Sequence, residues 1–112
     1  MTEDRIPTEL WVTAHMRQCM TKGIPVTISH KGEASGGTVM VKIFIAGQGC
    51  KLLNQTRDMD GKMGWMDVFD GEIVEERKAD DYIRRTTQRD PDVWVIEVED
   101  KSGANPFEGK IF

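Results

Sequence analysis

Residues 38–45 read TVMVKIFI and form the clearest β-strand pattern in the chain. The odd-numbered positions from 39 to 45 are Val or Ile, and the even-numbered positions are Thr, Met, Lys and Phe. Side chains of a strand point alternately to its two faces, so one face is fully apolar and the other, which carries Lys42, is mixed. The stretch therefore predicts a strand that packs its apolar face into a hydrophobic core.

Further strand patterns lie on either side of this one, at residues 25–30, 50–56 and 64–69. Gly-rich or Asp-Gly turns separate them, and links this short are typical of antiparallel neighbours. Residues 93–99 (VWVIEVE) predict a last strand with Trp94, Ile96 and Val98 on one face. Val93 and Val95 make the first half of the opposite face apolar as well.

Two helices are predicted, one before these strands and one between the last two. Residues 8–22 follow Pro7 and precede Gly23, which favour a helix start and a helix stop. At 100° per residue, the face expected to cover the sheet carries Val12, Met16, Cys19 and Met20.

Residues 78–89 predict the second helix. Ala79, Tyr82, Ile83 and Thr86 recur at helical spacing, and Pro91 ends the pattern. The sequence also predicts i,i+4 ion pairs on its outer face, Asp80 with Arg84 and Asp81 with Arg85.

These elements predict one α+β domain over residues 1–112, with an antiparallel sheet of about five strands and two helices in the order α-β-β-β-β-α-β. Two short helices are expected to cover one sheet face. Val93 and Val95 would then be left as exposed apolar surface, which favours a homodimer.

Composition excludes several classes of protein. Hydrophobic residues make up 38% and charged residues 30% of the chain, which is typical of a folded, soluble protein. No apolar run reaches the length of a membrane span, and Met1–Arg5 do not begin an export signal. Two distant cysteines, Cys19 and Cys50, fit reduced thiols in a cytoplasm. The net charge is −4, with residues 57–112 strongly acidic, which argues against nucleic-acid binding.

The order of elements, the tripeptide Leu10-Trp11-Val12 and the string DPDVWVIEVED at residues 90–100 resemble a small bacterial family, domain of unknown function 1491. The resemblance covers most of the chain. It implies a compact cytoplasmic bacterial domain with no assigned activity, and it carries over no catalytic residue.

The strongest candidate for a functional cluster is acidic and lies at the last strand. It comprises Asp90, Asp92, Trp94, Glu97, Glu99 and Asp100. Oxygen ligands grouped in this way suit Mg²⁺, Mn²⁺ or Ca²⁺. However, Asp92 and Glu99 are seven strand residues apart, roughly 23 Å at about 3.3 Å per residue, so they cannot share one ion. We therefore interpret the aspartates as turn residues and the glutamates as a solvated strand end, and we expect no metal or cofactor.

Other motifs have simpler structural explanations. The spacing of Thr56, Asp58, Asp60, Gly61 and Asp67 imitates a calcium loop, but strands flank it instead of helices, so we interpret it as a hairpin turn. Residues 47–51 (GQGCK) likewise read as a turn and not as a phosphate loop. His15 and Cys19 lie one helical turn apart, and we attribute both to packing and not to zinc binding or catalysis.

Three hypotheses for function follow, in order of preference. The first is a non-catalytic binding or regulatory module that self-associates as a homodimer and has a protein partner. The alternative is a small metal-assisted hydrolase that uses Asp92, Glu97, Glu99 and Asp100. The third is RNA binding through Arg84, Arg85 and Arg89, against which their expected pairing with Asp80, Asp81 and Asp90 counts.

Overall fold

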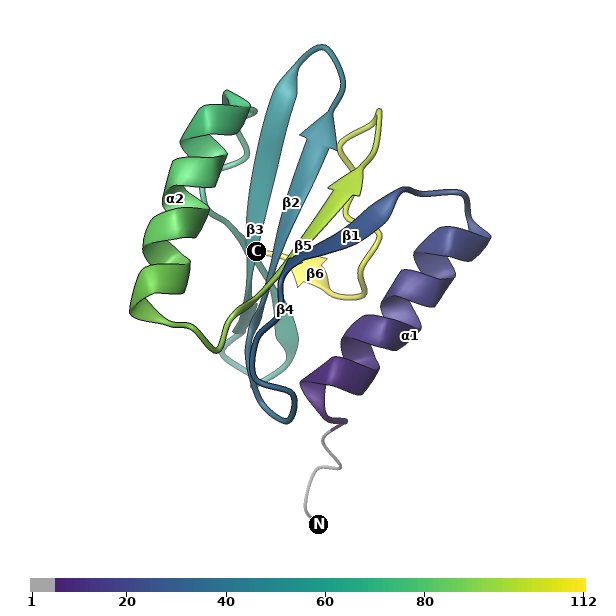
Figure 1. The fold of residues 1–112 in the computed structure, drawn as a ribbon, viewed down its shortest axis with the longest axis vertical. Coiled ribbons are helices and arrows are strands. Elements are labelled where there is room, and N and C mark those ends of the chain that lie inside the picture. Colours follow the sequence, from purple (N-terminus) through teal and green to yellow (C-terminus); the bar gives the residue numbers. More distant parts are fainter. Residues whose placement is uncertain (1–5) are drawn as a thin grey trace.

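The computed structural model describes residues 6–112, so the expectation about Met1–Arg5 lies outside the described residues. Within that range the chain forms two helices and six strands (Figure 1). Their bounds are α1 (Thr8–Thr21), β1 (Val26–His30), β2 (Val39–Ile45), β3 (Gly49–Arg57), β4 (Met63–Asp67), α2 (Glu76–Arg89), β5 (Trp94–Glu99) and β6 (Lys110–Ile111).

The strands form one mixed sheet in the order β1-β5-β2-β3-β4-β6. β5 runs parallel to β2 and β6 runs parallel to β4, while the other pairs are antiparallel. The prediction of an antiparallel sheet of about five strands was therefore wrong in two respects. The sheet is mixed, and the polar tail adds a sixth strand. This strand has only two residues and shows no apolar alternation from which it could be predicted.

The insertion of β5 between β1 and β2 explains the mixed sheet. The residues that link β1 to β2 do not form a hairpin, because they pass the beginning of β5: Glu33 N donates to Asp92 O at 3.0 Å, and Trp94 N donates to Thr38 O at 2.8 Å. A strand that is apolar on both faces is most stable in the interior of a sheet, where both faces are covered. The two-sided pattern of residues 93–98 therefore has its physical reason in this central position.

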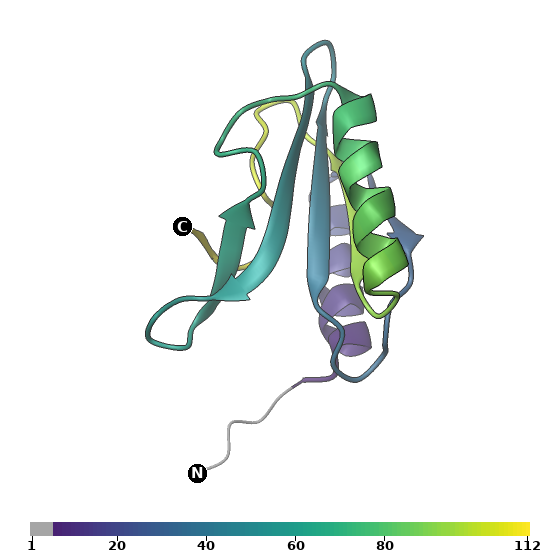
Figure 2. The same cartoon turned by 90° about the vertical axis from the view of Figure 1, so that its left-hand side faces the viewer.

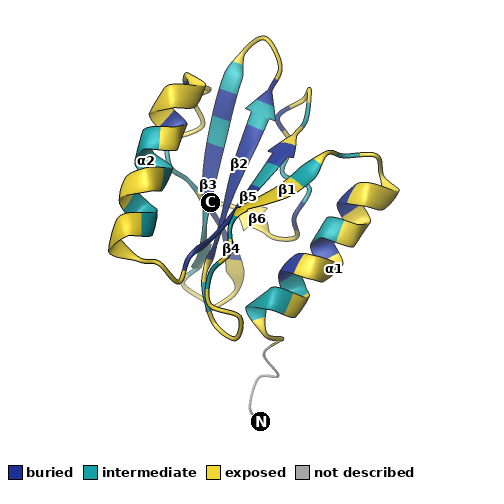
Figure 3. Ribbon diagram, in the orientation of Figure 1, coloured by how far each residue is buried: buried dark blue, intermediate teal, exposed yellow. Residues whose placement is uncertain are grey.

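The two helices cover opposite faces of the sheet (Figures 1 and 2). α1 packs Val12 and Cys19 against the face that carries Trp94, Ile96 and Val98. On the other face, Met40, Leu52, Val93 and Val95 form a separate cluster with Tyr82 and Ile83 of α2. Strands β2 and β5 are accordingly mostly buried, whereas the edge strand β1 is mostly exposed (Figure 3).

This arrangement corrects the expectation that one sheet face is left open. Val93 is 2% exposed and Val95 is 0% exposed. The facing of the last strand is confirmed, with Trp94 on one side and Val95 on the other, but α2 covers the side that was expected to be free.

The buried stripe of α1 also differs from the expected one. Val12, His15 and Cys19 are buried and Met16 is partly buried, whereas Met20 is 62% exposed. The buried side of α1 is therefore rotated from the expected one, and the reason is the contact that its aromatic side chains make with Phe107. The rings of Trp11 and His15 both lie 5.7 Å from that of Phe107, so the helix turns this side toward the core.

The C-terminal segment from residue 100 onward packs on the same face as α1. Phe107 is buried against Trp11, His15 and Trp65, and the indole Nε1 of Trp65 donates to Glu108 O at 3.0 Å. The backbone passes so close that a Cβ on Gly109 would lie 2.7 Å from Trp65 Nε1. A segment that reads as a polar tail therefore completes the core beside α1. Across residues 6–112, neither helix is long and apolar enough to span a membrane.

Candidate functional site

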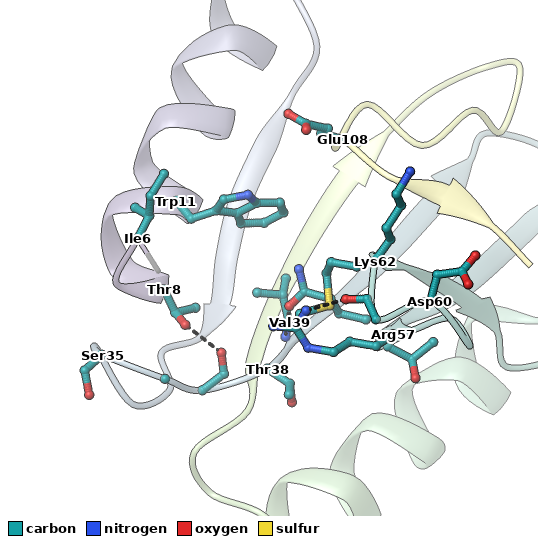
Figure 4. A pocket seen from close by; sticks show the side chains of 16 residues that line it. Ile6, Thr8, Trp11, Ser35, Thr38, Val39, Arg57, Asp60, Lys62 and Glu108 are labelled. Atoms are coloured by element: carbon teal, nitrogen blue, oxygen red, sulfur yellow. Dashed lines mark hydrogen bonds between the residues drawn. The ribbon is translucent and has the colours of Figure 1, made fainter. Parts of the chain in front are cut away.

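A hollow with a volume of about 910 Å³ lies between the beginning of α1 and the β3–β4 hairpin. We call it the Trp11 pocket (Figure 4). Its walls are built by Ile6, Thr8 and Trp11, by residues 35–39, 55–57 and 60–63, and by Glu108. Five separate segments of the chain therefore meet here.

The loop that forms one wall is held by its own hydrogen bonds. The Glu33 carboxylate accepts from Ser35 Oγ at 2.7 Å and from Gly36 N at 2.8 Å. Hydrogen bonds from the Ser35 hydroxyl and from the amides of Ser35 and Gly36 lower the pKa of Glu33. Thr8 Oγ1 donates to Gly37 O at 2.8 Å and ties the loop to the start of α1. A Cβ on Gly37 would lie 2.1 Å from Asp92 O, so glycine is required for this close approach.

The opposite wall is the β3–β4 hairpin, the segment whose spacing imitates a calcium loop. Asp58 Oδ1 accepts from Asp60 N at 2.8 Å and from Lys62 N at 2.9 Å, as turn-forming aspartates do. Arg57 Nη1 donates to Gly61 O at 2.7 Å and closes the turn from the other side. The hairpin thus places the cations of Arg57 and Lys62 at the pocket.

Three side chains of the pocket offer hydrogen-bond donors that are free among residues 6–112: the Trp11 indole, the Lys62 ammonium and the N–H groups of Arg57 that do not bind Gly61 O. Trp65 and Trp94 donate their indole N–H groups to backbone carbonyls, whereas that of Trp11 makes no such bond. No described carboxylate lies within 4.0 Å of the Arg57 or Lys62 cation. The indole ring of Trp11 projects into the pocket from α1, and the two cations belong to the facing wall (Figure 4). This set of donors suits a ligand with acceptor oxygens.

The acidic cluster expected at β5 is not brought together as one site. Asp90 and Asp92 lie before β5, where Asp90 Oδ1 accepts from Asp92 N at 3.1 Å. Asp100 follows the strand and accepts from the Ser102 hydroxyl and from Ala104 N, and these hydrogen bonds lower its pKa. Glu99 is exposed at the strand end.

The other two members of the expected cluster have separate roles. Trp94 is buried in the core, with its Nε1 donating to Glu33 O at 2.8 Å. Glu97 faces Lys42 at 3.5 Å. Among residues 6–112, no group of three or more His, Cys, Asp or Glu side chains is placed to hold a metal ion. The geometry required by the hydrolase alternative is therefore missing from its proposed residues.

A charged centre that the sequence analysis missed lies under α2. Lys42 is 3% exposed, and its Nζ lies 2.7 Å from Glu76 Oε2 and 2.7 Å from Asp80 Oδ1. Desolvation by burial acts to lower the pKa of Lys42, but the hydrogen bonds of Asp80 and Glu76 and the charge of Glu97 outweigh it and raise the pKa. The signal in the sequence was a lone lysine in the middle of an apolar strand.

This centre also corrects the ion pairs expected on α2. Asp80 faces Lys42 and not Arg84, while Arg84 Nη1 pairs with Asp81 Oδ1 at 3.0 Å, an i,i+3 spacing. Cys50 is buried on the same sheet face, and desolvation raises its pKa to about 11. Cys19 is buried under α1, and desolvation raises its pKa also. His15 Nδ1 bonds to Trp11 O at 2.9 Å, which agrees with a packing role.

Comparison with known proteins gives a family and similar folds. The model of a family described as protein of unknown function, DUF1491, matches residues 6–108. A crystal structure of a DUF1491 family protein from Caulobacter crescentus CB15 is 29% identical, with a TM-score of 0.86, and covers 96% of this chain and 100% of that chain. An NMR structure of a DUF1491 family protein from the same organism is 28% identical, with a TM-score of 0.81 and coverage of 98% and 99%.

A third structure shares the fold alone. The solution structure of protein Atu0922 from A. tumefaciens is 20% identical, with a TM-score of 0.72 and coverage of 87% of both chains. No curated protein matches the chain.

Proposed function

This chain belongs to the DUF1491 family of proteins of unknown function, and we propose that it is a non-catalytic binding module whose ligand occupies the Trp11 pocket. The observation that carries the proposal is the set of donors on two facing walls: the Trp11 indole, and the Arg57 and Lys62 cations. Among residues 6–112 their one hydrogen-bond acceptor is Gly61 O, which takes a single N–H of Arg57. A concave site with a few convergent polar groups is the usual form of a ligand site.

The chemistry of the walls favours a small ligand with a carboxylate or phosphate group. Arg57 donates one N–H to Gly61 O, so its other N–H groups are available to a ligand. A guanidinium binds carboxylate and phosphate groups through two parallel hydrogen bonds. Trp11 and Met63 add apolar surface beside these donors. Asp60 and Glu108 also line the pocket and favour a ligand whose anionic group lies at the Arg57 side.

Binding is favoured over catalysis by where the shifted titratable groups lie. Active sites tend to collect side chains whose pKa is strongly displaced. Here the pKa values of Lys42, Cys19 and Cys50 are raised in the packed core, away from the pocket walls. The carboxyl groups of Glu33 and Asp100, whose pKa values are lowered, are occupied by hydrogen bonds within their own turns.

A panel of small carboxylates, phosphate monoesters, amines and neutral amides tests the proposal. We expect the acids to shift the Trp11 indole resonance in ¹H–¹⁵N spectra, with Kd values of about 1 mM, as is ordinary for small fragments. Arg57→Gln with Lys62→Gln should weaken this binding about tenfold or more.

A matched control removes the same charge from the exposed side of α1, through Arg17→Gln with Lys22→Gln, and should leave binding unchanged. The proposal fails if no member of the panel shifts Trp11, or if the shifts persist in the Arg57 and Lys62 variant.

Self-association stays a prediction, and its surface is not the one first expected, because α2 covers Val93 and Val95. What supports it is a pair of exposed apolar side chains that share one face of the neighbouring strands β4 and β6, Met66 on β4 and Phe112 directly after β6. We expect a weak homodimer with a Kd of about 100 µM or less. Sedimentation at rising concentration checks it, and a single monomeric species up to about 100 µM would contradict it.

The proposal places the protein in a bacterial cytoplasm. Two observations support this location. The DUF1491 structures compared above come from a bacterium, and Cys19 and Cys50 are both free and buried.

A further inference from the structure

The outer side of α2 carries a stripe of positive charge. At 100° per residue, its five cations fall within one side of the helix: Arg77, Lys78, Arg84, Arg85 and Arg89. All five are exposed to solvent. Arg77 and Arg89 lie about 18 Å apart along the helix axis at a rise of 1.5 Å per residue. We call this surface the α2 stripe.

Two of the three acidic residues of α2 lie on its inner side, at Lys42. Glu76 and Asp80 both contact Lys42 Nζ at 2.7 Å and so point toward the sheet. Asp81 is the one carboxylate within the stripe, and it pairs with Arg84. In the described part of the chain, Arg77, Arg85 and Arg89 have no carboxylate within 4.0 Å.

The structure leaves Arg85 and Arg89 without the carboxylate partners that the sequence predicted for them, whereas Arg84 pairs with Asp81. Asp80 was expected to neutralise Arg84, and Asp90 to neutralise Arg89. Instead, Asp80 binds Lys42, and Asp90 Oδ1 accepts from the amide of Asp92. Lys78 lies over the Phe69 ring at 5.4 Å, and its charge stays accessible from solvent.

We propose that the α2 stripe binds the phosphate backbone of a nucleic acid without reading its sequence. Four of its five cations are arginines, whose planar guanidinium matches phosphate oxygens in a bidentate fashion. Contacts of this kind supply most of the affinity of non-specific binding and carry no base information.

An acidic protein surface fits the stripe less well. Protein interfaces are centred on buried apolar or aromatic anchors, and rim charges contribute little to affinity. The apolar side chains of α2, Tyr82 and Ile83, pack on the sheet. None of the large apolar side chains that are exposed in the described residues belongs to α2.

The net charge of −4 makes this binding weak but does not prevent it. At 50 mM salt the Debye length is about 14 Å, so charges on the far face of the sheet are partly screened from a ligand at the stripe. Glu75 and Asp90 lie at its two ends and limit its length. We expect a Kd of about 10–100 µM at 50 mM salt, within the ordinary range of non-specific binding.

Fluorescence anisotropy with the full chain tests the inference, using a 20-nucleotide RNA strand and a 20-base-pair DNA duplex as separate probes. The dependence of log K on log salt should have a slope of about −3 for the probe that binds, because about four phosphates are neutralised. The triple variant Arg77→Gln, Arg85→Gln and Arg89→Gln should lose at least tenfold in affinity, and the slope should move to between about −1 and zero.

A control with the same charge change, Arg17→Gln, Lys22→Gln and Lys101→Gln, should bind within about twofold of the natural chain, and unchanged melting curves show that both variants fold. A polyglutamate chain serves as the acidic-protein probe. The inference is overturned if neither nucleic acid binds below about 1 mM at 25 mM salt, if the stripe variant binds as well as the control, or if polyglutamate binds more tightly than both nucleic acids.

Discussion

Replacing Trp94 with alanine is expected to lower the free energy of unfolding by about 3–5 kcal/mol, the usual cost of removing a buried tryptophan side chain. Trp94 is 1% exposed and lies on the interior strand β5, on the side of the sheet that packs against α1. Its ring also lies against the loop backbone, where a Cβ on Gly32 would be 2.7 Å from Trp94 Cδ1. The variant loses packing on the sheet and on this loop together.

Urea denaturation, followed by circular dichroism, measures the loss. Trp94→Phe separates two contributions, because it keeps most of the apolar volume but leaves Glu33 O without the indole N–H that reaches it at 2.8 Å. We expect the hydrogen bond to account for about 1 kcal/mol. If Trp94→Ala lowers the free energy of unfolding by less than about 1 kcal/mol, the placement of Trp94 in the hydrophobic core is wrong.

The second large effect is expected at Lys42. Glu76→Gln with Asp80→Asn keeps the shape of both side chains but removes the two anions at 2.7 Å from a cation that is 3% exposed. Breaking a buried ion pair by removing the partner costs about 3–5 kcal/mol, and we expect the lower end of this range because Glu97 remains 3.5 Å from Lys42. Lys42→Met should cost less, because the side chains of Glu76 and Asp80 are 48% and 52% exposed and can be hydrated once the lysine is gone.

Alkaline pH provides an independent test of the same centre. The folded pKa of Lys42 is raised above its ordinary 10.5, so its contribution to stability is fully present below pH 10.5 and is lost as the pH rises through the folded value. Cys50 also lowers the stability of the folded state as the pH rises above 9.0. The thiol ionises there in the unfolded chain, whereas burial raises its pKa in the folded chain to about 11.

Comparing variants separates the two groups. The free energies of unfolding of the natural chain and of Lys42→Met, plotted against pH, should run parallel up to about pH 10 and converge above it. Both should fall by the amount due to the ionisation of Cys50. Parallel curves up to the highest pH at which the chain stays folded would mean that Lys42 makes no net contribution.

Local patterns predicted the elements well and their neighbours poorly. The alternation at residues 38–45 and 93–99 assigned each side chain of β2 and β5 to the correct face, because alternation depends only on the strand itself. Partner choice depends on contacts between distant residues. The link between β1 and β2 reads as a hairpin turn, and nothing within it shows that β5 occupies the place between them.

The candidate site was hidden for the same reason. The Trp11 pocket joins residues as distant as Thr8, Arg57 and Glu108, and none of these belongs to a local motif. The α2 stripe was predicted in part, since the sequence analysis already grouped Arg84, Arg85 and Arg89. Its acids were misassigned, because the partner of Asp80 is a lysine on a strand 38 residues away in sequence.

The position of β5 has a consequence for how the chain folds as it is synthesised. β1 precedes β5 by more than 60 residues, as the Ser29–Val95 hydrogen bond shows, and β2 borders β5 on its other side. Protein synthesis proceeds at about 5–20 residues per second, so several seconds pass between the synthesis of β2 and that of β5, the strand that lies between β1 and β2 in the sheet. Until then only the β2–β3–β4 meander can pair, and the apolar edge of β2 is open to other chains. Folding of this domain is therefore coupled to completion of its last third, and chains released before residue 94 are the ones most exposed to aggregation.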